Sequence, residues 1–240
     1  MSKIRLDQKL VELKLARNRS NADSFIRMGK VKVNGVVATK SGHAISAEDK
    51  VALDVDSNYV SRAAYKLESA TNAFRVDFFD KTVLDVGSST GGFTEYSIRH
   101  GAKKVIAIDV GTMQMHPSVS SSPRVELHEK TDIRDYWPEV KPDIVLIDVS
   151  FISLREILPH ISEISNKKTL VLAMLKPQFE SGTTLKHKGV IKNDKIRREI
   201  IHDFELWTRK YFLIIDKKDS AVLGSMGNKE RFYLLKIAKT

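Results

Sequence analysis

The sequence contains no cysteine among its 240 residues. This absence excludes disulfide bonds, zinc–thiolate sites and cysteine nucleophiles, and it fits a reducing compartment. No apolar run is long enough to cross a bilayer, and the N-terminus, MSKIRLDQKL, lacks the apolar core of a secretory signal peptide. Neither an internal repeat nor a low-complexity tract is present. We therefore expect a soluble, cytoplasmic protein without a membrane partner.

Clusters of histidine that could bind a metal are also missing from the sequence. His43, His116 and His187 stand alone, whereas protein metal sites draw their ligands from closely and regularly spaced residues. We predict that the protein requires no metal.

Positive charge is abundant, with a formal net charge of +10. Lysine and arginine gain binding energy by releasing counterions from phosphates, so this excess favours a polyanionic partner. The alternative is a basic surface that keeps the protein soluble by self-repulsion. Residues 1–40 hold ten Lys or Arg and three acidic residues, so an excess of seven charges lies in the first sixth of the chain. This concentration favours contact with a nucleic acid near the N-terminus.

Residues 1–56 are predicted to form two helices and a small sheet. Leucines at positions 6, 10 and 13 have helical spacing within residues 4–15, and apolar positions 22, 25 and 26 predict a second helix that ends near Gly29. The segment KVKVNGVV, residues 30–37, alternates in polarity and carries Asn34-Gly35, a strong hairpin signal. Val51, Leu53 and Val55 alternate again as a later strand.

A short linker, residues 57–60, precedes a different pattern in residues 61–240. Strand-like runs alternate with helical patterns there, which predicts a mostly parallel sheet with helices on both faces. The runs are Thr82–Val86, Val105–Val110, Asp143–Asp148, Leu170–Leu175, Phe212–Ile215 and Phe232–Ile237.

The segment VLDVGSSTGGFTE, residues 83–95, is the strongest chemical signal in the sequence. An apolar strand runs into Asp85, and the glycines at positions 87, 91 and 92 follow before a helix begins. Glycines allow positive φ and a close approach of the backbone to a ligand, and a helix N-terminus can face an electronegative group. The spacing G-x-x-x-G-G fits a dinucleotide fingerprint, G-x-G-x-x-G, poorly. Asp109 ends the next strand, where an acid typically binds ribose hydroxyls, so we predict an adenosine-type ligand.

Several segments together resemble one enzyme family. They are SRAAYKLE (61–68), DVGSSTGGFTE (85–95), DVSFISL (148–154), KPQFE (176–180) and GNKERFYLL (227–235). They resemble the TlyA family, also called hemolysin A-like ribosomal RNA methyltransferases, and more distantly the FtsJ-type ribose methyltransferases. Residues 1–56 resemble the RNA-binding domain of ribosomal protein S-four, through RLDQKL, the Arg17/Arg19 region and GKVKVNG.

The resemblance covers nearly the whole chain and implies both fold and ligand. It implies an α/β, Rossmann-like methyltransferase domain with a mostly parallel seven-stranded sheet in residues 61–240, after a small α+β RNA-binding domain in residues 1–56. The cofactor would be S-adenosylmethionine, and the partner would be ribosomal RNA or a ribosomal subunit, with no obligate protein partner. The nucleotide implied is cytidine.

The resemblance also implies a catalytic set of Lys66, Asp148, Lys176 and Glu230. A ribose hydroxyl is a weak acid, so the enzyme must mainly align it and remove its proton. A lysine with the usual pKa of about 10.4 is protonated at pH 7, but burial or a second cation lowers that pKa. Two lysines close together could therefore leave one neutral to act as a base. We predict Lys176 as that base because it ends a strand where ligands bind. Asp148 would orient it, while Lys66 and Glu230 would position the hydroxyl.

Two further sets of residues complete the predicted sites. The resemblance implies that Asp132, in TDIRD, contacts the adenine amino group, although an exposed turn residue is an equally good interpretation. The predicted cofactor-binding residues are Asp85, Gly87, Ser88, Ser89, Thr90, Gly91, Gly92, Phe93, Asp109, Asp132 and Asp148. The predicted RNA-binding residues are Arg5, Arg17, Arg19, Lys30, Lys32 and Arg62.

Two other functions compete with RNA ribose methylation. One is a non-catalytic RNA-binding or ribosome-assembly factor that keeps the cofactor site as a relic, which the complete set of four residues disfavours. The other is a membrane-lytic protein, suggested by the family's hemolysin label. Lysis requires an exposed amphipathic or apolar insertion segment, and the apolar runs of this sequence fit the core of a sheet instead.

Overall fold

The computed structural model describes residues 4–16, 18–27, 29–54, 59–180, 190–191, 193–220, 223–224 and 227–238. The chain divides into two compact units, Met1–Arg62 and Ala63–Thr240. Both contain a helix–sheet core of their own, so each can be understood from its own sequence pattern.

The first unit contains two helices and two small sheets. Helix α1 (Leu6–Glu12) packs against α2 (Arg19–Arg27). The strands are β1 (Ile4–Arg5), β2 (Val31–Val33), β3 (Val36–Ala38), β4 (Ala44–Ile45) and β5 (Val51–Leu53). They form a two-stranded sheet, β1-β4, and a three-stranded sheet in the order β3-β2-β5, both antiparallel.

The predicted hairpin at Asn34-Gly35 is confirmed. Val33 pairs with Val36 across these two residues, which have φ angles of 51° and 81°. Positive φ at both central positions is the signature of the type I′ turn that matches the twist of a hairpin. Gly29 is likewise found where predicted, in a left-handed conformation (φ 69°) after the end of α2.

The first helix is shorter than the pattern over residues 4–15 predicts. Ile4 pairs with Ile45 in a strand, so the helix begins only at Leu6. It ends at Glu12, because the chain turns at Lys14 with φ 57°, and this turn leaves Leu13 44% exposed rather than buried. The leucine spacing identified the helix but not the two interactions that limit it.

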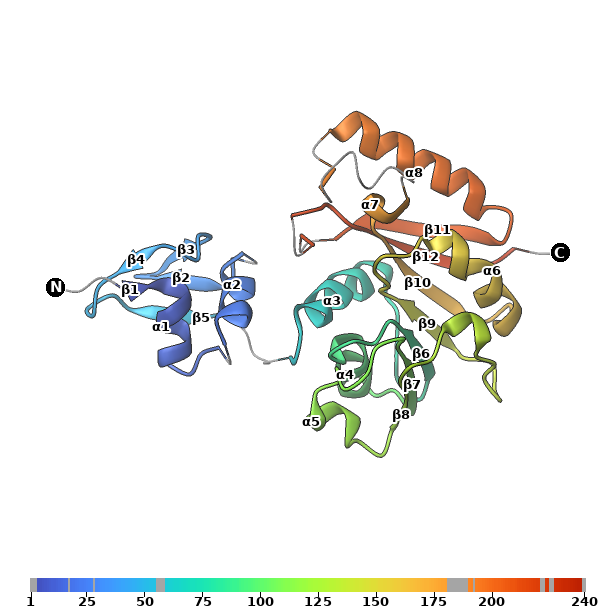
Figure 1. The fold of residues 1–240 in the computed structure, drawn as a ribbon, viewed down its shortest axis with the longest axis horizontal. Helices are drawn as coiled ribbons and strands as arrows, with labels where there is room; N and C mark the ends of the chain where they lie inside the picture. The colour runs from blue at the N-terminus through green and yellow to red at the C-terminus, as the bar shows by residue number, and fades with distance from the viewer. Residues whose placement is uncertain are drawn as a thin grey trace. The chain divides into compact units, whose positions relative to one another are not determined.

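The second unit is built on one seven-stranded sheet, shown in Figure 1. Its strands are β6 (Thr82–Val86), β7 (Lys104–Ile108), β8 (Val125–His128), β9 (Ile144–Ile147), β10 (Leu170–Leu175), β11 (Phe212–Asp219) and β12 (Arg231–Ile237). The order is β11-β12-β10-β9-β6-β7-β8, with β11 and β12 antiparallel to their neighbours and the other pairs parallel. The predicted fold class, a mostly parallel seven-stranded α/β sheet after a small α+β unit, is confirmed.

One strand, β8, was absent from the runs identified in the sequence. The strand Val125–His128 alternates apolar and polar residues over only four positions, and all four residues are half-buried, so its sequence pattern is short. It occupies one edge of the sheet, where it pairs only with β7. An edge strand needs less apolar surface than a central one, and its sequence signal is correspondingly weak.

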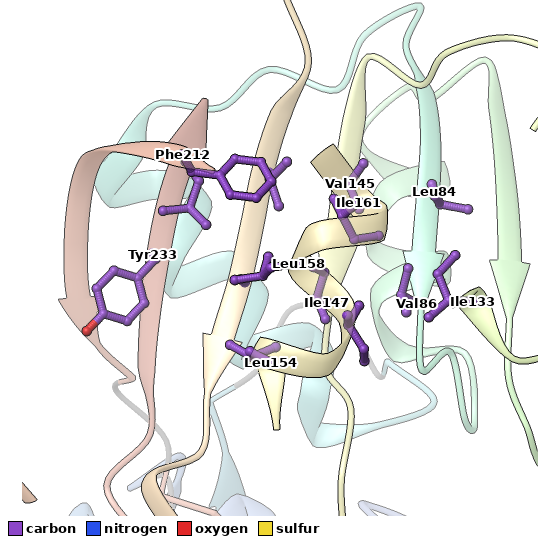
Figure 2. Packing of buried hydrophobic residues seen from close by; sticks show 14 of the residues in the cluster. Leu84, Val86, Ile133, Val145, Ile147, Leu154, Leu158, Ile161, Phe212 and Tyr233 are labelled. Carbon is purple, nitrogen blue, oxygen red and sulfur yellow. The ribbon is translucent and has the colours of Figure 1, made fainter. Parts of the chain in front are cut away.

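Helices cover both faces of this sheet. They are α3 (Arg62–Phe74), α4 (Gly92–Arg99), α5 (Pro117–Ser120), α6 (Leu154–Ile164), α7 (Pro177–Glu180) and α8 (Asp194–Thr208), with a 3₁₀ turn, η1 (Ile133–Asp135). Figure 2 shows Leu154, Leu158 and Ile161 of α6 packed over Val145, Ile147 and Tyr233. Neighbouring side chains of a strand point to opposite faces, so Asp85 and Phe232 point away from this cluster, toward α4.

The strand order creates a natural ligand site. From β6 the chain moves to β7 and β8 on one side, and β9 then lies on the other side of β6. In an open parallel sheet, ligands bind outside the carboxyl ends of the strands at such a switch point. The segments after β6, β7 and β9 are therefore expected to contain the ligand site.

Candidate active site

The glycine turn after β6 brings its backbone against the segment after β9. Gly87 has φ 83°, and a Cβ atom there would lie 2.8 Å from the carbonyl oxygen of Asp148. Gly91, with φ 88°, stands at the N-terminus of α4. Any side chain at position 87 would separate the two segments, so the requirement for glycine is steric as well as conformational.

Asp85 lies beneath this turn and is completely buried. One carboxylate oxygen, Oδ2, accepts a hydrogen bond from the Thr94 hydroxyl at 2.6 Å. The other oxygen, Oδ1, and the hydroxyl of Ser88 have no hydrogen-bond partner among the described residues. Burial raises the pKa of Asp85 to about 7, and the nearby charge of Asp148 adds to the effect of burial. Buried polar atoms without partners are rare in proteins, so these two can accommodate a donor group of a ligand.

Asp109 follows β7 and organises the next loop. Its carboxylate accepts the backbone N–H of Ser89 at 2.8 Å and that of Gly111 at 2.7 Å. Each carboxylate oxygen has two lone pairs, so both oxygens retain the capacity to accept a hydroxyl donor. The acid predicted to bind ribose is therefore fixed by the backbone and still able to bind a ligand.

A cavity of about 370 Å³ lies at this edge of the sheet, within the range of small-molecule sites. Five predicted residues line it: Gly87, Ser89, Asp109, Asp132 and Asp148. The other lining residues are Val86, Ile108, Val110, Gln114, Thr131, Ile133, Val149, Ser150, Phe151, Ile152 and Ile157. The mixture of several carboxylates and many apolar side chains fits a ligand with a positive charge, hydroxyl groups and an apolar ring.

The other predicted cofactor residues surround the turn rather than lining the cavity. Asp85, Ser88, Gly92 and Phe93 are buried, Phe93 against Phe232 with ring centroids 6.2 Å apart. Thr90 is exposed, and Gly91 packs against Met115 and Val119. These residues shape the turn that carries Gly87 and Ser89.

Asp132 lies at the cavity but already has a strong partner. Its two carboxylate oxygens accept hydrogen bonds from the Arg134 guanidinium at 3.0 and 2.6 Å, and one also accepts the Arg134 backbone N–H. These bonds hold the pKa of Asp132 below its usual value. The residue therefore caps the 3₁₀ turn η1 and borders the cavity, and its contact with an adenine amino group stays a prediction.

The second unit contains two lysine–carboxylate ion pairs, one of which shares Asp148 with this cavity. Lys176 Nζ lies 2.6 Å from Asp148 and donates a hydrogen bond to the Ser150 hydroxyl at 2.8 Å. Lys66 Nζ lies 2.6 Å from Glu230. Lysine and glutamate are almost never buried unless they are paired, and here Lys66, Lys176 and Glu230 are all buried.

The sheet brings the two ion pairs side by side. Leu175 pairs with Arg231 in the antiparallel ladder between β10 and β12. Lys176 and Glu230 are the next residues along the two chains, so they face each other across the ladder, on the same face of the sheet. The close packing extends to Gly224, where a Cβ atom would lie 2.6 Å from Glu230 Oε1. The four residues predicted by resemblance thus lie together as two neighbouring ion pairs, which we call the constellation.

The first unit contains most of the predicted RNA-binding residues, and their side chains are largely exposed or paired with acids. Arg5 and Arg19 both donate to Asp7 at 3.0 Å, while their side chains stay 49% and 57% exposed. The guanidiniums, Arg5 first, hold the pKa of Asp7 below its usual value. Lys32 pairs with Asp54 at 3.1 Å, and Lys30 is exposed. Arg17 lies outside the described residues.

The sequence did not predict eleven of the lining residues, among them Ser150, Phe151 and Gln114. Ser150 and Phe151 lie two and three residues after Asp148, and Gln114 lies five residues after Asp109. Phe151 has φ 66° and is 91% exposed, which is unusual for a large aromatic residue. The available signal was position, because residues immediately after the strand ends of such a sheet reach the ligand.

Two absences concern the described part of the chain. It contains no group of three or more His, Asp or Glu side chains able to hold a metal ion. It also contains no helix with the length and apolar character needed to cross a membrane. His187, considered above, lies outside the described residues.

Comparison with known proteins agrees with this geometry. Residues 59–237 match the FtsJ-like methyltransferase family, and residues 4–51 match the S4 domain. The chain is 35% identical, over 97% of its length and 89% of the relative, to the 16S/23S rRNA (cytidine-2′-O)-methyltransferase TlyA of Mycobacterium tuberculosis. It is 34% identical to Hemolysin A of Brachyspira hyodysenteriae, over 95% of this chain and 97% of that one.

Solved structures share the same fold. A protein from Streptococcus thermophilus named as a hemolysin superposes with a TM-score of 0.75 at 32% identity, covering 100% of this chain and 90% of that one. This chain thus contains a glycine turn and two lysine–carboxylate pairs. Its sequence and its fold both match the TlyA and hemolysin proteins along nearly the full length. The chain belongs to the TlyA, or hemolysin A-like, family of FtsJ-like methyltransferases.

Proposed function

We propose that this protein transfers a methyl group from S-adenosylmethionine to a ribose 2′-hydroxyl of ribosomal RNA, and that the nucleotide is cytidine. The observation that carries the proposal is the pair of ion pairs, Lys66–Glu230 and Lys176–Asp148, of which the second shares Asp148 with the cavity that contains Asp109. The related proteins from Mycobacterium tuberculosis and Campylobacter jejuni are named for 2′-O-methylation of cytidine in rRNA. These names support the choice of substrate.

The residues around the cavity fit each part of this cofactor. Asp109 would accept the ribose hydroxyls, and apolar side chains such as Val110 and Ile133 would enclose the adenine. Ser89, which lines the cavity, would contact the amino-acid end, and the buried Asp85 and Ser88 would support the turn that carries it. When bound, S-adenosylmethionine supplies a sulfonium-linked methyl group that is already activated toward nucleophiles.

The protein's own task is to orient the ribose hydroxyl and remove its proton. Lys176 Nζ would accept that proton, because it is held at the carboxyl end of β10 by Asp148 and Ser150. The role of base requires the neutral form of Lys176 when the hydroxyl binds, and Asp148, at 2.6 Å, would orient the side chain. Lys66 and Glu230, next in the constellation, would position the hydroxyl.

The first unit would bring the RNA to this site. Its S4-type sequence and its paired arginines, Arg5 and Arg19, provide exposed guanidiniums suited to phosphate groups. Lys30, Lys32 and Arg62 would add positive charge. Phosphate contacts fix the position of the RNA, while the choice of nucleotide depends on the methyltransferase unit.

The Lys176→Ala variant tests the catalytic part of the proposal. Loss of a general base costs about 10²- to 10⁴-fold in rate, so we expect methylation of ribosomal RNA to fall by at least about 100-fold. The Kd values for cofactor and RNA should change little. Lys168→Ala is a matched control, because Lys168 is exposed just before the other end of the same strand.

Two outcomes would contradict the proposal. Methylation retained by Lys176→Ala would remove Lys176 from the role of base. Cofactor binding by the unaltered protein without turnover on any ribosomal substrate would favour a non-catalytic factor instead. Mapping ribose methylation in ribosomal RNA from cells with and without the protein identifies the modified nucleotide.

A further inference from the structure

The side chain of Glu180 makes a buried connection between two segments of the active site. Glu180 ends the short helix α7, four residues after Lys176, and its side chain is 1% exposed. Its carboxylate accepts a hydrogen bond from the Ser153 hydroxyl at 2.5 Å and another from the Leu154 backbone N–H at 2.8 Å. Ser153 and Leu154 lie at the end of the segment that begins with Asp148.

The same two segments are joined at three places along their length. At the strand ends, Lys176 contacts Asp148 and Ser150. Further along, the rings of Phe151 and Phe179 lie with centroids 5.2 Å apart. Glu180 makes the third of these connections. Residues 148–154 and 176–180 are therefore held together from the contacts of Lys176 to the end of α7.

Helix capping alone does not account for Glu180. The hydroxyl of Ser153 already caps α6 by accepting the Arg155 backbone N–H at 3.1 Å. Glu180 is therefore a second acceptor at this helix end, and it comes from the other segment. Its burial has a cost, since desolvation raises the pKa of the carboxyl group despite the hydrogen bonds from Ser153 and Leu154.

We propose that Glu180 is a positioning residue for methyl transfer: by holding residues 153–154 against the end of α7, it keeps Asp148 and Ser150 in contact with Lys176. This inference rests on the proposed function, because it assumes that Lys176 is the base. Catalytic groups must be held to within about 0.5 Å of their productive geometry. Glu180 acts through its neighbours and has no role in contacting the substrate.

The test compares three variants of the full chain. Glu180→Ala removes both acceptors, whereas Glu180→Gln keeps an acceptor oxygen for the Leu154 N–H. Asp203→Asn is the control, because Asp203 is exposed and contacts Arg155, which also lies 3.7 Å from Glu180, without joining the two segments. For each variant we would measure kcat, the KM for RNA, the Kd for S-adenosylmethionine by calorimetry, and the melting temperature.

We expect Glu180→Ala to lower kcat about tenfold, which corresponds to one lost buried hydrogen-bonding group. The cofactor Kd should rise less than threefold, because Asp109 and the glycine turn belong to other segments. Glu180→Gln should recover most of kcat, and Asp203→Asn should match the unaltered protein. A purely structural role predicts instead that melting temperature, cofactor Kd and kcat change together.

Three results would overturn the inference. They are a kcat for Glu180→Ala within twofold of the unaltered protein, a loss of kcat matched by an equal loss of cofactor affinity, and no recovery in Glu180→Gln. The Lys176→Ala variant separates this inference from the proposed function. If Lys176→Ala is inactive and Glu180→Ala is fully active, only the role of Glu180 fails; if Lys176→Ala stays active, the proposed function fails.

Discussion

The buried ammonium group of Lys66 lies 2.6 Å from the carboxylate of Glu230, although 164 residues separate them in the sequence. The contact joins α3, the first helix of the second unit, to the residue before its last strand, β12. One ion pair thus closes the methyltransferase unit and also supplies half of the proposed catalytic set. Stability and activity should therefore respond differently when the pair is altered.

Replacing one partner of this pair should destabilise the protein more than replacing both partners with apolar residues. Loss of one partner leaves a buried charge uncompensated, which costs about 3–5 kcal/mol, whereas replacing both with apolar residues is often neutral. We expect Lys66→Met and Glu230→Leu each to lower the free energy of unfolding by about that amount in urea titrations. The double variant should recover most of the stability but none of the methylation. A double variant that is active would remove both residues from the site.

The alanine variant of Gly87 should damage the cofactor site and the fold together. A left-handed conformation costs a non-glycine residue about 1–2 kcal/mol, and the new Cβ would meet the Asp148 carbonyl oxygen at 2.8 Å. We expect lower stability and at least tenfold weaker binding of S-adenosylmethionine by calorimetry. Gly101→Ala is the control, since Gly101 has φ 88° and packs on Phe79, near the amino end of β7. It should lose stability and keep cofactor affinity.

Asp85 should make the stability of the protein depend on pH. Its pKa is raised from 3.8 to about 7 by burial, so between these values the folded protein binds a proton that the unfolded chain has released. Stability contributed by this group therefore falls as pH rises from about 4 to 7, by at most ~1.4 kcal/mol per pH unit. We expect the difference in unfolding free energy between the unaltered protein and Asp85→Asn to follow this slope. A difference that is flat across this range would contradict the assignment.

RNA binding should depend on the arginines that share Asp7. If Arg19 contacts one phosphate, Arg19→Ala should weaken binding of ribosomal RNA and reduce the slope of log Kd against log salt by about one. Arg19→Lys keeps the charge and should keep the slope, while losing the paired geometry with Asp7. Filter binding over a range of salt concentrations measures both quantities. An unchanged slope in Arg19→Ala would place this residue outside the RNA contact.

Much of the fold was predictable because its signals are local. Strand β6, the glycines after it and the turn at Asn34-Gly35 each depend on a few adjacent residues, and the structure has them where the sequence placed them. Strand β8 was missed because its alternation of apolar and polar residues covers only four positions. The late start of α1 was missed because it depends on pairing between Ile4 and Ile45, forty-one residues apart.

The candidate site divides in the same way. By itself the sequence determined the glycine turn, the acids that end β6 and β7, and, through family resemblance, the identity of the four catalytic candidates. Tertiary structure alone decided that Glu230 faces Lys66, that Asp109 binds the backbone of the turn, and that Glu180 connects the segments after β9 and β10. The reason is physical: propensity and capping act over a few residues, whereas buried ion pairs and close backbone contacts exist only once the sheet has brought distant strand ends together.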